Sequence, residues 1–237
     1  MKMKKLSTIL IVIGLIIILI PIGGKLYSQY KENKMIAEWL EDSTVEATTT
    51  DVAPEEAYAE LDDAFSSESE SSESTNTDQT DENHGQTQQA GQTKPKKKVN
   101  QTVLGVISIN KIKCKYPIVE GVKEVNLSAG IGHITGSAYP GQPGNCALAG
   151  HRNYTFGRFF NRLDEIKNGD VINITTKSGT YKYVVYDKFE VTPDDVSVIK
   201  GDKDDNIITL ITCTPIYVAT HRLIVRARLE SASALDP

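Results

Sequence analysis

Residues 99–237 predict a mainly β domain that closes, or nearly closes, into a barrel. Six segments rich in β-branched and aromatic residues are separated by clusters of Gly, Pro or Asp, the pattern of short strands joined by turns. These segments are TVLGVISI, KYPIVEG, GDVINITT, GTYKYVVYDKFEVT, NIITLITC and HRLIVRARL. FGRFFNRLDEI is the one stretch of this region that favours a helix or a helix with a turn, so one or two short helices are expected beside the strands. Many short strands with one helix are typical of a barrel, and a region of this length can support its own core.

The N-terminal residues 1–34 predict a membrane anchor. Residues 6–24 carry no charge and are dominated by Ile and Leu, and a helix of roughly 20 such residues spans a bilayer. A cleaved signal peptide is the alternative, since Lys2, Lys4 and Lys5 precede the run. The run exceeds the ~7–15 apolar residues of a signal peptide, and no small-residue cleavage site follows it. We therefore expect a single-pass protein of the cell membrane with its body on the extracellular side.

Residues 35–98 predict a disordered acidic spacer between the anchor and the body. Residues 35–93 contain sixteen Asp and Glu and no Lys or Arg. Such a segment buries too little apolar surface to offset its ordering entropy, and its charges repel and extend it. The stretches MIAEWLED and EEAYAELDDAF favour short helices within the spacer.

The charge of the chain changes sign after the spacer. The formal net charge is −5, but from residue 94 onward twenty Lys and Arg face fourteen Asp and Glu. The lysine-rich residues 94–98 lack the interleaved aromatic residues of a nucleic-acid surface. No nucleic-acid partner is predicted.

The cysteines predict neither a disulfide framework nor a metal site. Their number is odd, so at least one thiol stays outside any disulfide, and a bridge between Cys114 and Cys146 is an open alternative. Cys146 with His151 and Cys213 with His221 lack the short spacings of a structural zinc site. No metal is expected.

The segment TLITCTPIYVATHRLIV, residues 209–225, contains the strongest candidate for a nucleophile. Strand alternation places Cys213 at the end of one strand and Arg222 at the start of the next, away from that strand's apolar side. If the two strands pair, these side chains lie side by side. With a histidine, His151 or His221, they would supply a thiolate, a proton shuttle and an oxyanion donor. The alternative is that Cys213 is a small buried hydrophobe.

Two motifs resemble those of the sortases, the cysteine transpeptidases of Gram-positive cell surfaces. They are TLITCTP with the following HR, and GIGHITGSAYPGQPGNCALAGHRN upstream, and the resemblance covers residues 103–229. It implies a closed sortase-type β-barrel with His151, Cys213 and Arg222 as catalytic residues. It also implies that Thr209 and Thr212 support the site through hydrogen bonds. His133 and His221 do not match catalytic positions and are expected to be structural, and Arg152 is taken as a possible surface charge.

The resemblance further implies the reaction and its partners. A sortase cleaves an LPXTG-like sorting signal of a surface protein between Thr and Gly through a cysteine thioester, and transfers the acyl group to a peptidoglycan precursor or another cell-wall amine. The order of His before Cys differs from that of papain-like thiol proteases. A catalytically silent peptide-binding barrel and a hydrolytic cysteine peptidase are the alternatives.

The subclass and the metal requirement are less strongly indicated. The chain lacks the Asp-Pro-aromatic lid motif of pilin-assembling members, and DDAF in the spacer is not counted as a lid, so class D is expected, with class A as the alternative. No cofactor is expected. Calcium dependence stays open, because no calcium site is matched to the acidic residues Asp164, Glu165, Asp194 and Asp195.

Overall fold

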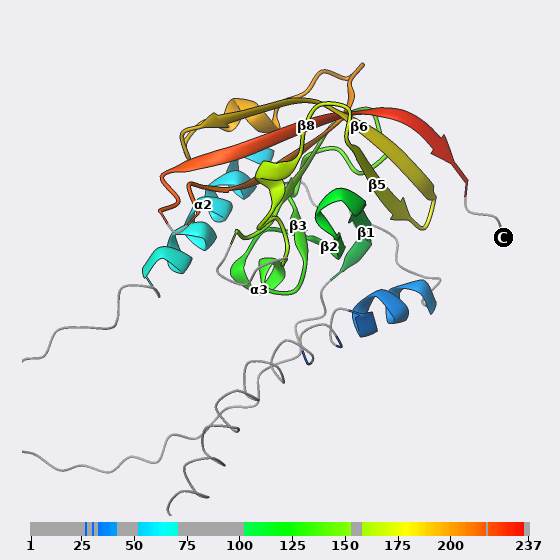
Figure 1. The fold of residues 1–237 in the computed structure, drawn as a ribbon, viewed down its shortest axis with the longest axis horizontal. Helices are drawn as coiled ribbons and strands as arrows, with labels where there is room; N and C mark the ends of the chain where they lie inside the picture. The colour runs from blue at the N-terminus through cyan, green and yellow to red at the C-terminus, as the bar shows by residue number, and fades with distance from the viewer. Residues whose placement is uncertain are drawn as a thin grey trace, which may run out of the picture.

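The computed structural model describes residues 27, 30, 33–41, 52–70, 102–152, 158–216 and 218–234. Eight strands within them form one closed barrel in the order β1-β2-β3-β4-β7-β8-β6-β5 (Figure 1). The strands are β1 (Val103–Ile109), β2 (Cys114–Glu120), β3 (Ile131–His133), β4 (Gly144–Ala149), β5 (Val171–Thr176), β6 (Gly179–Val191), β7 (Asn206–Thr214) and β8 (His221–Ser233). This confirms the predicted mainly β closed barrel.

Two of the strand pairs are parallel, and one of them decides where the site lies. β2 pairs with β3 and β4 pairs with β7 in parallel, while the other pairs are antiparallel. The carboxyl ends of β4 and β7 therefore meet at one edge of the barrel wall. β8 pairs antiparallel with β7, so its first residues lie at the same edge.

The six predicted strands are present, but the sequence reasoning missed β3 and β4. FGRFFNRLDEI is not a continuous helix over its described residues, which form turns and the short 3-10 helix η2 (Leu163–Glu165), closer to the helix-and-turn alternative. Phe159 adopts a positive φ of 46°, which an α-helix does not accommodate. Phe159 and Phe160 are both buried against the barrel interior. Filling the barrel therefore overrides the local helical preference.

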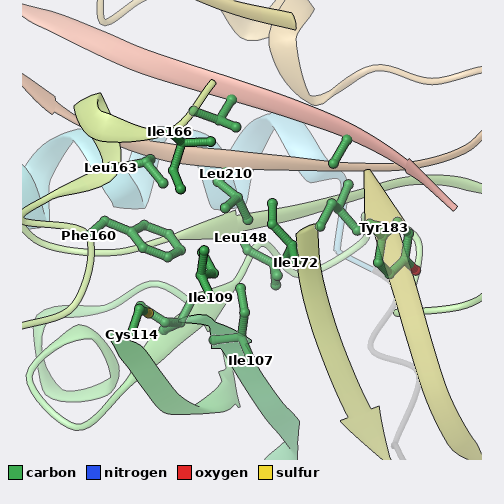
Figure 2. Packing of buried hydrophobic residues seen from close by; sticks show 14 of the residues in the cluster. Ile107, Ile109, Cys114, Leu148, Phe160, Leu163, Ile166, Ile172, Tyr183 and Leu210 are labelled. Atoms are coloured by element: carbon green, nitrogen blue, oxygen red, sulfur yellow. The ribbon is translucent and has the colours of Figure 1, made fainter. Parts of the chain in front are cut away.

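The interior is a packed apolar core rather than a channel. Figure 2 shows Ile107, Leu148, Ile172 and Leu210 converging on the barrel axis from four strands. Tyr183 also lies inside, and its hydroxyl accepts a hydrogen bond from the Gly141 N–H at 2.8 Å. Inward and outward residues alternate along each strand, which leaves the opposite face free to build a site.

Cys114 and Cys146 belong to this interior and do not form the alternative disulfide bridge. Burial raises the pKa of Cys114 to about 12. Burial also raises the pKa of Cys146 far above that of an ordinary thiol, with the Glu120 carboxylate adding to the effect. Since the thiolate is the reactive form, both side chains act as small apolar core residues.

The predicted membrane-spanning residues 6–24 lie outside the described residues. None of the helices in the described parts of the chain has both the length and the apolarity to cross a membrane. Residues 33–41 are helical, as MIAEWLED suggested. Their Trp39 is buried against three valines of the barrel wall, Val103, Val106 and Val119.

The spacer contains a second helix, α2 (Pro54–Glu70), in a segment that was expected to be disordered. Its start is well specified, since proline suits the first helical position and two glutamates follow in the first turn. Its apolar residues recur on one stripe, at Ala57, Tyr58, Leu61, Ala64 and Phe65, and all five are buried. EEAYAELDDAF is thus helical, and burial of this stripe offsets the ordering cost.

The stripe of α2 packs on the outer face of β4, β7 and β8. Its partners there include Ala147, Ala149, Ile211 and Ile224. Figure 1 shows α2, in cyan, lying against the β8 side of the barrel. The remaining short elements are α3 (Glu124–Leu127), η1 (Asn110–Ile112) and η3 (Val196–Ile199).

Candidate active site

The nucleophile candidate and the arginine lie directly opposite each other in the sheet. Cys213 of β7 pairs in register with Arg222 of β8, as the alternation of the two strands predicted. Cys213 belongs to the outer cluster that α2 covers, together with Ile211 and Ile224. Arg222 is held by its own backbone neighbourhood, since its Nη1 donates to the carbonyl oxygens of Ala219 (3.0 Å) and His221 (3.2 Å).

The parallel pairing of β4 with β7 brings His151 to the same edge. Ala149 pairs with Ile211, so His151, two residues further along, reaches the level of Cys213. The Gly150 N–H donates to the Ile211 carbonyl at 3.0 Å, and the Thr212 hydroxyl donates to the Gly150 carbonyl at 2.7 Å. A side chain at Gly150 would come within 2.7 Å of Ile131 and 2.9 Å of Phe160, so glycine keeps this approach close.

Thr209, the other threonine of the TLITC motif, is hydrogen-bonded at a distance from Cys213 on the same strand. The Thr209 hydroxyl donates to Asn145 Oδ1 at 2.8 Å, and both groups are buried. The Asn145 amide in turn donates to the carbonyl oxygens of Val198 and Lys200, each at 3.0 Å. Thr209 therefore ties the strand to the η3 loop, while Thr212 ties it to the residue before His151.

Helix α2 covers all three groups. Cys213, His151 and Arg222 are only 4%, 2% and 3% exposed. The Phe65 ring lies 5.6 Å from the His151 ring and 5.2 Å from the Arg222 guanidinium carbon. Asp62 forms a short ion pair with Arg222 Nη2.

DDAF, which was not expected to act as a lid, covers the candidate site in the structure. Its aspartate pairs with the site arginine and its phenylalanine covers the site histidine. DDAF has no proline and lies inside α2. The sequence indicated a short helix at EEAYAELDDAF, but such a pattern does not show what the helix will pack against.

An acidic residue that sequence reasoning missed also contacts the histidine. Glu124, the first residue of α3, places Oε2 3.1 Å from His151 Nε2, and its own side chain is 55% exposed. The sequence offered no signal for it, because the contact depends on how α3 sits beside β3. A carboxylate here can orient the imidazole.

The other basic candidates divide between structural roles. His133 is fully buried, with Nδ1 3.0 Å from Glu120 Oε2 and Nε2 3.1 Å from the Ala138 carbonyl. His221 is exposed. Arg152 is not the surface charge that the sequence suggested, because its side chain is only 8% exposed and pairs with Asp164 at 2.9 Å.

The acidic residues weighed for calcium have other partners in the structure. Asp164 pairs with Arg152, and Glu165 accepts two hydrogen bonds from Arg162 at 2.7 Å each. Asp195 accepts from the backbone of Ser197 at the start of η3. In the described parts of the chain, no three His, Cys, Asp or Glu side chains gather as metal ligands would.

The covered face continues beyond the N-terminus of α2 into a cavity of about 650 Å³. Asn145 of β4, Ile199 of η3 and Arg226 of β8 contribute to its lining, with Pro54 and Glu55 of α2 at its rim. Arg226 is four residues from Arg222, which is about 13 Å along an extended strand. Cys213, His151 and Arg222 do not line this cavity, and α2 fills the face between them and it.

Fold and site together define a class: a closed β-barrel with cysteine, histidine and arginine at one edge of its wall, the set of groups used in nucleophilic acyl transfer. The sortase domain family matches residues 107–230, just over half of the chain. The chain belongs to the sortase family. Sortases are, as a family, cysteine transpeptidases.

Named relatives agree with this membership. Sortase A of Streptococcus agalactiae serotype III (strain NEM316) is 35% identical over 137 residues, 55% of this chain and 54% of the relative. Sortase D of Bacillus subtilis (strain 168) is 33% identical over 111 residues, 47% of this chain and 54% of the relative. The chain therefore spans about half the length of these curated relatives. The structure of sortase A from Corynebacterium diphtheriae matches with a TM-score of 0.53 at 37% identity, over 59% of this chain and 65% of that one.

Proposed function

We propose that this chain is a membrane-anchored sortase that cleaves an LPXTG-like sorting signal between Thr and Gly and transfers the acyl group to a cell-wall amine. The observation that carries the proposal is the register of Cys213 with Arg222 at the edge that His151 also reaches. Residues 6–24 would serve as the anchor, with the barrel outside the cell membrane. The partners would be surface proteins with such a signal and a peptidoglycan precursor or another amine.

The chemistry begins with the ionisation of Cys213. An ordinary cysteine and histidine would form a thiolate and imidazolium pair only about one per cent of the time, given thiol and imidazole pKa values near 8.5 and 6.5. The Arg222 guanidinium, directly across the strand pair, favours the anion at this edge. The sortase mechanism therefore needs the arginine as well as the histidine.

Cys213, His151 and Arg222 are enough to account for every bond and proton in the proposed reaction, so the proposal includes no cofactor. The Cys213 thiolate attacks the threonine carbonyl, and Arg222 stabilises the oxyanion that forms. The bond from threonine carbon to glycine nitrogen breaks, His151 gives its proton to the departing amine, and a thioester remains. The acceptor amine then attacks the thioester, loses its proton to His151, and releases the thiolate.

We propose that the outer face of β4, β7 and β8 binds the sorting peptide in extended conformation once α2 has left it. Four residues in extended conformation span about 13 Å, which is the separation along β8 between Arg222 and Arg226, a residue of the cavity lining. The apolar floor of Ala147, Ala149 and Ile211 suits the leucine and proline of a sorting signal. The same floor now binds α2, so the helix has to leave before a sorting peptide can reach Cys213.

We propose class D as the subclass, with class A as the alternative. Relatives named sortase A and sortase D match the chain at 35% and 33% identity. The helix over the site belongs to the spacer and not to the barrel.

The test uses the full-length chain in detergent micelles, an LPXTG-type peptide and a glycine-based amine. We expect a peptide–amine product whose formation is abolished by Cys213→Ala and His151→Ala. His221→Ala is the matched control and should retain activity, since that side chain is exposed. Product formed by Cys213→Ala at the wild-type rate would contradict the proposal.

The two alternatives give different products in the same assay. Cleavage without transfer, even at high amine concentration, would identify a hydrolytic peptidase. Binding of the peptide without any cleavage, in a variant whose α2 no longer covers the site, would identify a silent peptide-binding barrel.

A further inference from the structure

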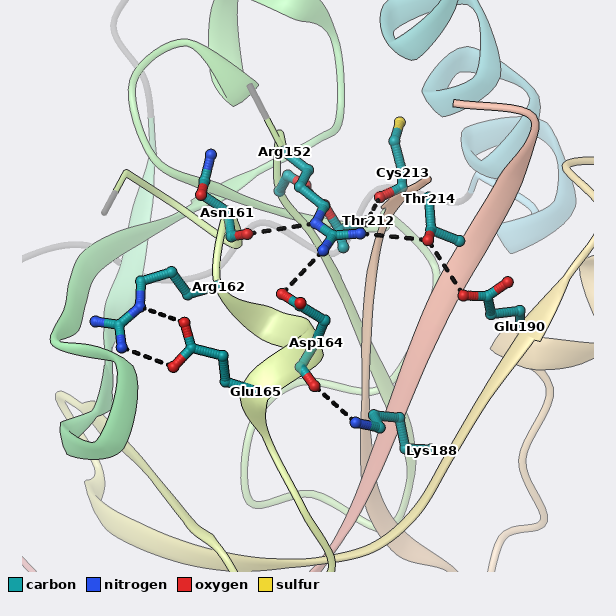
Figure 3. Close-up of polar contacts among 11 residues, drawn as sticks. Arg152, Asn161, Arg162, Asp164, Glu165, Lys188, Glu190, Thr212, Cys213 and Thr214 are labelled. Carbon is teal, nitrogen blue, oxygen red and sulfur yellow. Dashed lines mark hydrogen bonds and ion pairs between the residues drawn. The ribbon is translucent and has the colours of Figure 1, made fainter. Parts of the chain in front are cut away.

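Arg152 joins the two segments that carry the histidine and the cysteine. Its Nη1 lies 3.4 Å from the Cys213 carbonyl oxygen and 3.3 Å from Thr214 Oγ1, and it donates to both. Its Nε donates to the Asn161 carbonyl at 3.3 Å, and its Nη2 pairs with Asp164 at 2.9 Å. Figure 3 shows the guanidinium at the centre of these contacts.

The place of Arg152 follows from where the strand ladder ends. The last backbone bond from the β4 segment to β7 is donated by Gly150 to Ile211. Two residues further on, the Cys213 carbonyl on the same edge accepts from the Arg152 side chain instead. The guanidinium thus continues the ladder past the point where the backbone after β4 turns away.

This arrangement ties His151 to β7 on both sides. On one side, Gly150 bonds to Ile211 and accepts from Thr212. On the other side, Arg152 donates to Cys213 and Thr214. The separation and direction of the imidazole relative to the cysteine therefore depend on Arg152.

The geometry points to Arg152 as a positioning residue for the reaction proposed above: it sets the alignment of His151 with Cys213 without touching the reacting atoms. In Figure 3 the Cys213 sulfur points away from the guanidinium, toward the side where α2 lies. Only an arginine fits the role, because its planar fork holds several acceptors in a fixed geometry and a lysine ammonium does not. This inference rests on the proposed function.

The test compares Arg152→Lys and Arg152→Gln with Arg162→Gln in the full-length chain. Arg162 is the matched control, since it lies in the same turn region and makes a two-pronged pair with Glu165 at the surface. A displacement of about 1 Å in a catalytic pair costs on the order of 100-fold in rate. We expect both Arg152 variants to lose about 100-fold in kcat, with KM within twofold, and Arg162→Gln to retain both parameters.

A readout beyond the rate separates positioning from simple structural support. The pH profile of kcat/KM should change shape in both Arg152 variants, because proton transfer between His151 and Cys213 depends on the alignment of the two groups. A wild-type profile with a reduced amount of active enzyme would overturn the inference. Full kcat in folded Arg152→Gln, or full rescue by Arg152→Lys, would overturn it as well.

Asp164→Asn gives an independent measurement if Arg152→Gln does not fold. It keeps Arg152 but removes the carboxylate that holds one arm of the fork, and we expect a loss of about fivefold to tenfold in kcat. Unchanged kcat in Asp164→Asn would then overturn the inference. An inactive wild-type chain would contradict the proposed function, whereas an active wild type with active Arg152 variants would contradict this inference alone.

Discussion

Removing the Phe65 ring should expose the site. Phe65 is 1% exposed and lies against both His151 and Arg222. Burial of a phenylalanine side chain contributes about 1.5–3 kcal/mol, which at about 1.4 kcal/mol per factor of ten corresponds to a shift of about 10- to 100-fold toward the uncovered state. Phe65→Ala is therefore the most informative single change in α2.

The ion pair of α2 contributes less than the ring. Asp62 pairs with Arg222, but the Asp62 side chain is 46% exposed, and exposed ion pairs are worth roughly 0.5 kcal/mol. Asp62→Asn should shift the covering equilibrium only about twofold. The neighbouring Asp63 is exposed on the other side of the helix, so Asp63→Asn is the matched control with no expected effect.

The assay is the rate at which iodoacetamide alkylates Cys213, followed by mass spectrometry of the intact chain. We expect the rate to rise about 10- to 100-fold in Phe65→Ala, about twofold in Asp62→Asn, and not at all in Asp63→Asn. The kcat/KM for transpeptidation should follow the same order. A wild-type alkylation rate in Phe65→Ala, with an unchanged melting temperature, would refute the role of α2 as a cover.

Three further predictions concern the parts of the barrel around the site. Thr209→Val should lower the free energy of unfolding by about 1–3 kcal/mol, measured in urea, because the buried Asn145 loses its partner. Cys114 and Cys146 have raised thiol pKa values, so folded Cys213→Ala should take up no iodoacetamide at pH 8, and any labelling would contradict their placement. Burial opposes ionisation of Glu120, but hydrogen bonds from its histidine and threonine partners lower its pKa below 4.5. The contribution of Glu120 to stability is therefore present above pH 4.5 and lost as the pH falls through the lowered pKa. Glu120→Gln should reduce the pH dependence of the free energy of unfolding, measured in urea between pH 6 and pH 3.

The pairing of β7 with β8 could be predicted because it depends on two neighbouring stretches of the sequence and the short connection between them. The alternation in NIITLITC and HRLIVRARL assigns Cys213 and Arg222 to outward positions, and the two runs are separated by a short connection. An antiparallel pair of that kind leaves little choice of register once each apolar face is buried. The structure places the two residues directly opposite each other.

The strand that carries the histidine was missed for the opposite reason. β4 is short, and its GNCALA sequence has no β-branched residue. It is a strand because it fills the gap between β3 and β7, which is a property of the closed barrel. His151 was therefore found through its resemblance to a family motif, and not through the residue pattern.

By itself, the sequence predicted a β-barrel, the facing of Cys213 and Arg222, and a short helix at EEAYAELDDAF, because these depend on residue periodicity within single segments. Only the tertiary structure decided that α2 lies over Cys213, His151 and Arg222, that Phe159 and Phe160 fill the barrel interior, and that Arg152 bridges β7 to the histidine segment. Those outcomes depend on which surfaces meet. Which surfaces meet is set by the parallel pairing of β4 with β7 and by the packing of residues that are far apart in the chain into one buried cluster.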